Sequence, residues 1–176
     1  MTPLCDVCAR AHKETDMLII SGGSSVGPRD YALEAISRLS DARILFHGIP
    51  ISPGKPTILA RAGGKPVWGL PGHVVSAMVV FEVVVKPFID QLNGLDPGKK
   101  RRWPIPARLD RNVASAQGRQ DLIRVRMVKR DGEYWAQPIL GKSGLIHTLV
   151  QADGIVAINM NCEGLEKGTI VDVIPM

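Results

Sequence analysis

The feature that most constrains the fold is a short apolar run, residues 17–20, that stops abruptly at the sequence SGGSSVGPRD. Its length and the glycines that bound it predict a buried strand. Apolar residues at helical spacing follow between Tyr31 and Leu39 and predict a helix. Asp30 stands just before this helix, where its side chain can cap the first N–H groups. A strand, a glycine-rich turn and a helix in this order are typical of an α/β fold.

The alternation of strands and helices continues to about residue 93. Further strands are predicted at residues 44–46, 57–60 and 66–68. The last two flank Gly63 and Gly64 and have the pattern of a hairpin. The apolar segment from residue 70 to about 92 predicts a buried helix that Pro87 kinks or divides. We therefore expect an α/β layer fold with a mostly parallel sheet.

The second part of the chain has a different pattern. Residues 93–106 are rich in Gly, Pro and charge, and we interpret them as a linker. Residues 122–128 alternate apolar and basic side chains, and a turn at Asp131 and Gly132 joins them to a second strand at 134–139. Two later apolar runs and a short helix around 145–151 complete a predicted small β-barrel or sandwich. We place the two domains at 1–97 and 98–176.

Charge and cysteine usage limit the class of protein. The net charge of +5 lies entirely in residues 98–176, so that module has a positive face for an anionic ligand or nucleic acid, or simply a solvated surface. The basic run KKRR lacks interleaved aromatic residues, which disfavours nucleic-acid binding. Cys5 and Cys8 form a redox pair, half a zinc site, or two small residues on one helical face. No membrane helix or signal peptide is predicted, and we expect a cytoplasmic protein.

Three glycine-containing turns carry the candidate chemistry: SGGSSVGPRD at 21–30, SPGKP at 52–56, and GLPGH at 69–73. Glycines let a ligand approach the backbone, and turn N–H groups at a helix start attract phosphate-like anions. Lys55 projects from a turn stiffened by prolines, which suits a phosphate partner. Each turn also has an ordinary interpretation: a capped turn, an exposed lysine, and a capping or packing histidine at His73. We expect the three turns to share one edge of the sheet, where α/β folds bind ligands.

The motifs in this order and spacing resemble the molybdopterin molybdenumtransferases, the MoeA family that includes gephyrin-type E domains. The segments SGGSSVGPRDY, HGIPISPGKPTIL and GLPGHVVSAMVVFEVVVKPFI carry the resemblance in the first module. In the second, GRQDLIRVRM, GKSGLIHTLVQADGIVAI and EGLEKGTIVDV resemble the family's small C-terminal barrel. The implied fold class is α/β: a partial MogA-like three-layer αβα domain with a mostly parallel sheet, followed by a small all-β barrel domain.

The resemblance implies an activity and a set of site residues. The family inserts molybdate into adenylated molybdopterin and releases AMP, with Mg²⁺ as the divalent cation. By motif position, Asp30 and Lys55 are the catalytic candidates, and Asp30 is also the metal ligand. The substrate-binding candidates are Ser21, Gly22, Gly23, Ser24, Ser25, Gly27, Pro53, Gly54, Pro56, Leu70, Pro71, Gly72, His73, Ser76 and Ser143. Two other functions stay open: a non-catalytic module that binds molybdopterin or a partner protein, and an activity like that of molybdopterin adenylyltransferases.

The sequence also departs from the family pattern. Ser52 replaces a basic residue that often precedes PGKP, and Val74 replaces a proline after the GLPG motif. Family members carry an upstream strand with a TGDE-like motif and two further N-terminal domains, so the acidic partner of Asp30 is not in this sequence. Half a sheet would expose an apolar edge strand. We therefore expect a truncated reading frame, an expression fragment or one half of a split protein, with a homodimer or a separate upstream polypeptide as partner.

Overall fold

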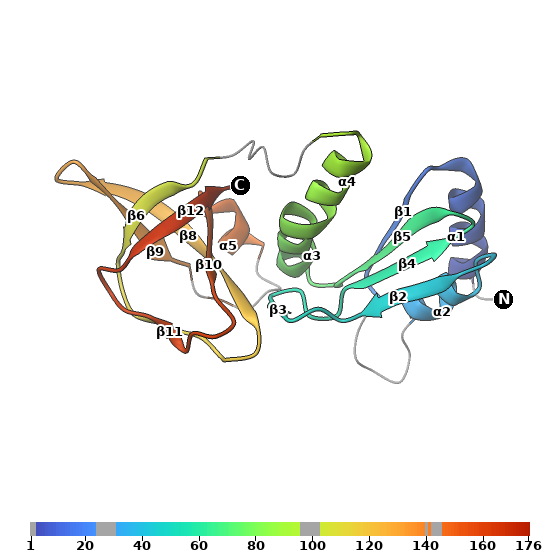
Figure 1. Cartoon of the computed structure of the whole chain (residues 1–176), viewed down its shortest axis with the longest axis horizontal. Helices are drawn as coiled ribbons and strands as arrows, with labels where there is room; N and C mark the ends of the chain where they lie inside the picture. The colour runs from blue at the N-terminus through green and yellow to red at the C-terminus, as the bar shows by residue number, and fades with distance from the viewer. Residues whose placement is uncertain (1–2, 24–30, 96–102, 140, 142–145) are drawn as a thin grey trace. The chain divides into compact units, whose positions relative to one another are not determined.

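The computed structural model describes residues 3–23, 31–95, 103–139, 141 and 146–176 (Figure 1). The chain divides into two compact units. We call Met1–Ile49 with Gly54–Ala77 the α/β unit, and Pro50–Pro53 with Met78–Met176 the barrel unit. The predicted boundary near residue 97 stays a prediction.

The α/β unit is built on a mixed sheet. Its elements are α1 (Pro3–Glu14), β1 (Leu18–Ser21), α2 (Tyr31–Ser37), β2 (Arg43–His47), β4 (Ile58–Ala62) and β5 (Lys65–Leu70). The strand order is β1-β5-β4-β2, with β1 parallel to β5 and the other two pairings antiparallel. The expected α/β class is confirmed, but the described sheet is mixed rather than mostly parallel. The reason is local: Gly63 and Gly64 both adopt positive φ, and such a two-residue turn forces the strands that it joins to run antiparallel.

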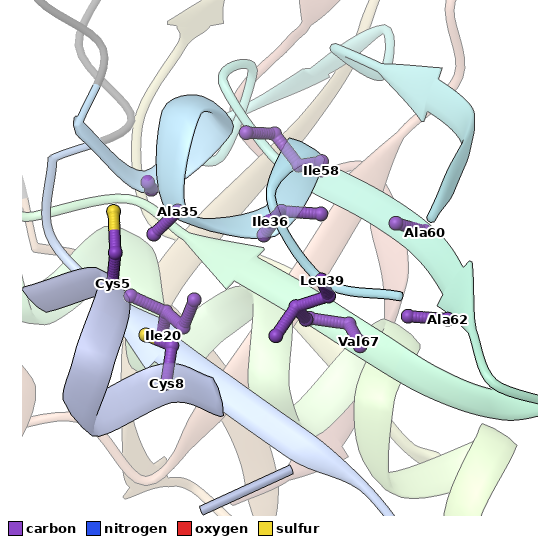
Figure 2. Packing of buried hydrophobic residues seen from close by; sticks show 11 residues of the cluster. Cys5, Cys8, Ile20, Ala35, Ile36, Leu39, Ile58, Ala60, Ala62 and Val67 are labelled. Atoms are coloured by element: carbon purple, nitrogen blue, oxygen red, sulfur yellow. The ribbon is translucent and has the colours of Figure 1, made fainter. Parts of the chain in front are cut away.

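The core of the α/β unit lies where the two helices meet one face of this sheet (Figure 2). Cys5 and Cys8 come from α1, Ala35 and Ile36 from α2, and Val67 from β5. Both cysteines are buried and unbridged, and burial, with a contribution from Cys5, raises the pKa of the Cys8 thiol. Both side chains lie on the buried side of α1, which is the position that the interpretation of this CxxC as two small residues on one helical face predicts. Figure 2 shows both side chains extending from α1 among the labelled core residues.

Strand β1 is an outer strand of the described sheet, with β5 as its one neighbour among the described residues. Its side chains alternate, so Ile20 is buried in the core while Ile19 is 37% exposed. Strand β2 is the other outer strand, and Leu45 at its centre is 53% exposed. Among the described residues, each outer strand of the sheet thus carries at least one exposed apolar side chain, and the expected long apolar edge stays a prediction.

A lysine ties the end of helix α1 to the hairpin. The Lys65 ammonium donates hydrogen bonds to the carbonyl oxygens of His12 and Thr15 at 2.9 and 2.7 Å, with a longer one of 3.4 Å to Lys13. The last carbonyls of a helix lack intrahelical donors and carry partial negative charge, so a cation there is favourable. The His12 ring lies 2.9 Å from the Ala62 carbonyl oxygen through Nε2. Together these contacts fix where α1 ends on the sheet.

The apolar segment after β5 is helical, as predicted, from Val74 to Leu92. It consists of α3 (Val74–Val80), a π-helical turn η1 (Phe81–Val85) and α4 (Lys86–Leu92). Pro87 has no N–H, and its ring would clash with the carbonyl four residues earlier in a regular α-helix. The wider π turn directly before α4 accommodates the proline and divides the two α-helices. None of the helices among the described residues is long and apolar enough to cross a membrane.

The barrel unit contains a closed five-stranded barrel, which resolves the choice between barrel and sandwich. Its strands are β6 (Ile105–Leu109), β8 (Gln120–Arg130), β9 (Glu133–Pro138), β10 (Gly154–Ile158) and β12 (Ile170–Pro175). The order β10-β12-β6-β9-β8 closes because β8 also pairs with β10. Buried side chains from every strand fill the interior, among them Leu109, Val125, Ala136, Ile158 and Val173.

Several smaller elements correct or extend the predictions. The predicted linker is too long at its C-terminal end, because Ile105 and Pro106 already belong to β6. Residues Ile51–Ser52, predicted as part of a turn, form strand β3, which runs parallel to β8. A two-stranded ladder joins β7 (Val113–Ala114) to β11 (Gly164–Leu165), and the described part of the short helix is α5 (His147–Val150). These pairings are non-local, so no local pattern indicates them.

Candidate ligand site at one edge of the sheet

The strand register brings the three glycine-containing turns to the same edge of the α/β sheet. Ser21 at the end of β1 lies opposite Leu70 at the end of the parallel strand β5. Ile58, the first residue of β4, pairs with Gly69 of β5 and with His47, the last residue of β2. The turn between β2 and β4 therefore leaves the sheet at the edge where β1 and β5 end. This arrangement is the one expected from the sequence.

The first and third turns pack backbone against backbone. The Gly22 N–H donates a 3.1 Å hydrogen bond to the Leu70 carbonyl oxygen. A Cβ built on Gly72 would lie 3.4 Å from the Gly22 Cα. A side chain at either glycine would fill the space between the two turns. The glycines thus allow a close approach, here of one turn to the other.

Gly23 joins the first turn to the start of helix α2. Its φ of +73° is unfavourable for residues with a side chain, and its Cβ would lie 3.1 Å from the Ala32 backbone nitrogen. The same Ala32 N–H donates a 3.4 Å hydrogen bond to the Gly23 carbonyl oxygen. Ser21, before the two glycines, is exposed at the edge of the sheet.

The middle turn is closed by its own hydrogen bonds. The Gly48 N–H donates to the Thr57 carbonyl oxygen at 2.8 Å, and the Ile49 N–H donates to the Lys55 carbonyl oxygen at 2.9 Å. The buried Thr57 hydroxyl donates a 2.6 Å hydrogen bond to the Gly54 carbonyl oxygen. These bonds leave the Lys55 side chain exposed on a constrained backbone. An exposed ammonium on a fixed loop can contact an anion with little loss of backbone entropy.

The third turn leads into helix α3. Pro71 is buried and Gly72 is exposed. The His73 carbonyl oxygen accepts the first helical hydrogen bond, 2.9 Å from the Ala77 nitrogen, while its side chain is exposed. Val74 is the first helical residue and is 45% exposed, so α3 starts normally despite the missing proline. Ser76 is 5% exposed, so its hydroxyl is hardly accessible to a ligand.

Five of the predicted site residues, Ser24, Ser25, Gly27, Asp30 and Ser143, lie outside the described residues. Within the described residues, no group of three or more His, Cys, Asp or Glu side chains could hold a metal ion. The donor set that Mg²⁺ prefers, several oxygens around one point, is therefore not met by the described residues at this edge. Asp30 stays a sequence-based candidate ligand for Mg²⁺.

Sequence reasoning did not single out two buried charged residues on β8. Arg124 lies in the strand predicted from alternation, yet its side chain is 6% exposed. Its guanidinium donates a 3.5 Å hydrogen bond to the Gly141 carbonyl oxygen, and Nε has no hydrogen-bond partner among the described residues. Burial lowers the pKa of this guanidinium, which nonetheless stays protonated at neutral pH. Arg124 is therefore a buried cation beside the Gly141 carbonyl oxygen within the barrel unit.

Asp121, the other buried charged residue, is 4% exposed. It accepts a 2.7 Å hydrogen bond from the Ser115 hydroxyl and lies 3.0 Å from Arg119 Nε. Burial alone raises the pKa of this carboxyl, but hydrogen bonds from Ser115, Arg119 and Ser52 outweigh burial, so its pKa lies below the ordinary value. Ser115, Arg119 and Asp121 lie close together in sequence, so their contact could have been expected. Ser52, by contrast, is distant from Asp121 in sequence.

A mixed α/β sheet with three glycine-containing turns at one edge, followed by a five-stranded barrel, defines an α/β protein with an appended β-barrel module. Two family models match the chain. Residues 4–91 match the family described as a probable molybdopterin binding domain, and residues 106–176 match the MoeA C-terminal region, domain IV. The chain belongs to the MoeA family of molybdenum cofactor biosynthesis proteins.

Individual relatives agree with this assignment. A molybdopterin molybdenumtransferase of Staphylococcus epidermidis is 33% identical over 172 residues, which cover 96% of this chain and 40% of the relative. A protein of Methanocaldococcus jannaschii whose name relates it to molybdopterin biosynthesis is 37% identical over 164 residues, 93% of this chain and 37% of that protein. The chain spans about two fifths of the length of these relatives.

Solved structures show the same fold. The crystal structure of a molybdopterin biosynthesis MoeA protein from Pyrococcus horikoshii has a TM-score of 0.80 and 33% sequence identity. The similarity covers 99% of this chain and 40% of the Pyrococcus chain. A molybdenum cofactor biosynthesis protein from Pyrococcus furiosus gives a TM-score of 0.72 over 95% of this chain and 51% of its own, with 28% identity.

Proposed function

We propose that this chain acts in the insertion of molybdate into adenylated molybdopterin, with release of AMP, as a molybdopterin molybdenumtransferase or as the C-terminal portion of one. One observation carries the proposal: the register of β1, β5, β4 and β2 gathers three separate family motifs at one edge of the sheet. Ligand sites of α/β sheets lie at this edge, and each of the three turns carries a segment that resembles the family. Family membership supports molybdopterin as the ligand.

The three turns have separate roles in this proposal. The backbone around Gly22 and Gly23, with Ser21, binds the phosphate of the pterin ligand, because a turn without Cβ atoms lets an anion approach N–H groups. Lys55 contacts a second anion, molybdate or the AMP phosphate, as an exposed point charge on a closed loop. His73 borders the same edge as a hydrogen-bonding group.

A reconstituted reaction tests the proposal. Purified protein is mixed with adenylated molybdopterin and molybdate, and AMP is measured over time, with and without an upstream polypeptide from a full-length relative. We expect molybdate-dependent AMP release that Asp30→Ala and Lys55→Ala reduce. Lys13→Ala, at another exposed lysine of the same unit, is the matched control and should leave the rate unchanged.

The alternatives predict different results. A non-catalytic module binds adenylated molybdopterin without turnover, even with the upstream polypeptide supplied. An adenylyltransferase-like activity forms adenylated molybdopterin from ATP, and does not need molybdate. The match of residues 106–176 to the MoeA C-terminal region favours the molybdenumtransferase over this last alternative. A reaction in which the complemented protein releases no AMP contradicts the catalytic proposal.

A further inference from the structure

A buried threonine holds the turn that carries Lys55 from within the α/β unit. Thr57, the residue before β4, has 0% exposure, and its hydroxyl donates a 2.6 Å hydrogen bond to the Gly54 carbonyl oxygen. A buried hydroxyl without a partner costs free energy, so the fold favours the turn conformation that supplies this acceptor. Thr57, Gly54, Lys55 and Ile49 all belong to the α/β unit, so the contact lies inside one compact body.

The sheet fixes the position of Thr57 itself. Ile58, the next residue, pairs with His47 of β2 and with Gly69 of β5. The Gly48 N–H continues the pairing of β2 with β4 by donating a 2.8 Å hydrogen bond to the Thr57 carbonyl oxygen. A β-branched side chain on a fixed backbone has few rotamers. The hydroxyl is therefore a rigid donor for the turn.

Two hydrogen bonds restrain the peptide groups on either side of Lys55. The Gly54 carbonyl belongs to the peptide group that precedes the lysine, and the Lys55 carbonyl belongs to the one that follows it. The Thr57 hydroxyl bonds the first carbonyl, and the Ile49 N–H bonds the second at 2.9 Å. Because each peptide group is planar, orienting both planes restrains the two backbone dihedrals of Lys55 and the direction of its Cα–Cβ bond.

We propose that Thr57 is a positioning residue for Lys55: its hydroxyl holds the Gly54–Lys55 peptide group and so sets the direction in which the lysine leaves the turn. The role rests on the proposed function, in which Lys55 contacts molybdate or the AMP phosphate. Thr57 itself is buried and does not touch the ligand. A turn that is ordered beforehand loses less conformational entropy on binding. The competing interpretation is that the hydroxyl only stabilises the α/β unit as a whole.

The chain offers matched variants for this test. Thr57→Val and Thr57→Ala remove the hydroxyl, and both are made because a valine methyl needs more room than a hydroxyl. Thr57→Ser keeps the hydroxyl. Thr15→Val is the control elsewhere in the unit, because the Thr15 hydroxyl also bonds a backbone carbonyl, that of Ala11, at 2.8 Å.

Hydrogen exchange measured by NMR on the whole chain distinguishes the two interpretations. The Ile49 amide reports on the Lys55 carbonyl that it bonds, and the amides of β5, an inner strand of the sheet, report on opening of the whole unit. We expect loss of the Thr57 hydroxyl to speed exchange at Ile49 about tenfold relative to β5, the order expected for one hydrogen bond. Thr57→Ser and Thr15→Val should keep the wild-type ratio.

Three results overturn the proposal. They are an equal acceleration at Ile49 and β5, an unchanged Ile49 amide in a folded variant without the hydroxyl, and failure of both Thr57→Val and Thr57→Ala to fold. The last result would assign the threonine to the stability of the whole unit. If only one of the two variants folds, that variant decides the matter.

A double-mutant cycle separates this inference from the proposed function. Dissociation constants for sodium molybdate and for AMP are measured by titration calorimetry for wild type, Thr57→Val, Lys55→Ala and the double variant. We expect Thr57→Val to weaken binding when Lys55 is present and to have no effect when it is absent, while Thr57→Ser binds as wild type does. If Lys55→Ala leaves both affinities unchanged, the proposed role of Lys55 fails, and the exchange experiment still decides whether Thr57 orders the turn. If Lys55→Ala weakens binding but Thr57→Val does not, the positioning role is wrong.

Discussion

Replacing Gly23 by alanine tests how closely the first turn packs on helix α2. The new Cβ would lie 3.1 Å from the Ala32 backbone nitrogen and 3.5 Å from the Tyr31 Cβ, at a residue whose φ is +73°. The left-handed conformation costs roughly 1–2 kcal/mol for a residue with a side chain. Crowding against a backbone atom that cannot rotate away adds about 1–3 kcal/mol. The sum predicts a loss of about 2–5 kcal/mol in the free energy of unfolding.

Gly64→Ala is the matched control, because Gly64 has a φ of +83° but no atom within 4 Å of its added Cβ. This variant should lose only the conformational part, roughly 1–2 kcal/mol. Urea unfolding followed by circular dichroism gives both values, and binding of adenylated molybdopterin should be weaker in the Gly23 variant than in the Gly64 variant. Equal stability losses in the two variants would refute the reasoning, because the close approach to Ala32 would then cost nothing.

Three further predictions concern other charged contacts. Lys65→Met removes the donor to three carbonyls at the end of α1, so thermal unfolding should show a loss of about 1–3 kcal/mol and α1 amides should exchange faster. The pKa of Asp121 is lower in the folded than in the unfolded state, so its stabilising effect is present above pH about 3.9 and is lost as the pH falls toward the folded-state pKa. Unfolding midpoints in urea should accordingly fall more steeply below that pH in wild type than in Asp121→Asn. Arg124→Met should unfold near the wild-type temperature, since an apolar side chain can replace a buried charge without loss of stability. A large fall in the unfolding temperature would show instead that the hydrogen bond to the Gly141 carbonyl oxygen outweighs the cost of burying the charge.

The local elements and the three turns were predictable because their signals are local. Apolar spacing identified β1, α2 and the hairpin, and paired glycines marked the turn at Gly63 and Gly64. The convergence of the motif turns followed from a general property of α/β sheets rather than from any one residue. The predicted hairpin already implied one antiparallel pair of strands. The prediction of a mostly parallel sheet did not take this pair into account.

Some residues of the candidate site were likewise found from local sequence patterns, and others only from the structure. Lys55, His73 and the glycines were identified from sequence because turn chemistry uses few residue types. Burial of Arg124 was not predicted, because alternation in a strand indicates two faces but not what covers each of them. The pairing of β3 with β8 was not predicted either, since a two-residue strand paired with a distant one leaves no periodic pattern.

By itself, the sequence determined the order of strands and helices, the change from an α/β to a β pattern, and the motifs that identify the MoeA family. These depend on periodicity and on residues with special backbone freedom, and both can be read along the chain. Only the tertiary structure decided that Gly22 meets Gly72 and that the barrel closes through β8 and β10. Each of these contacts joins residues far apart in sequence, so its free energy depends on packing that no local pattern contains.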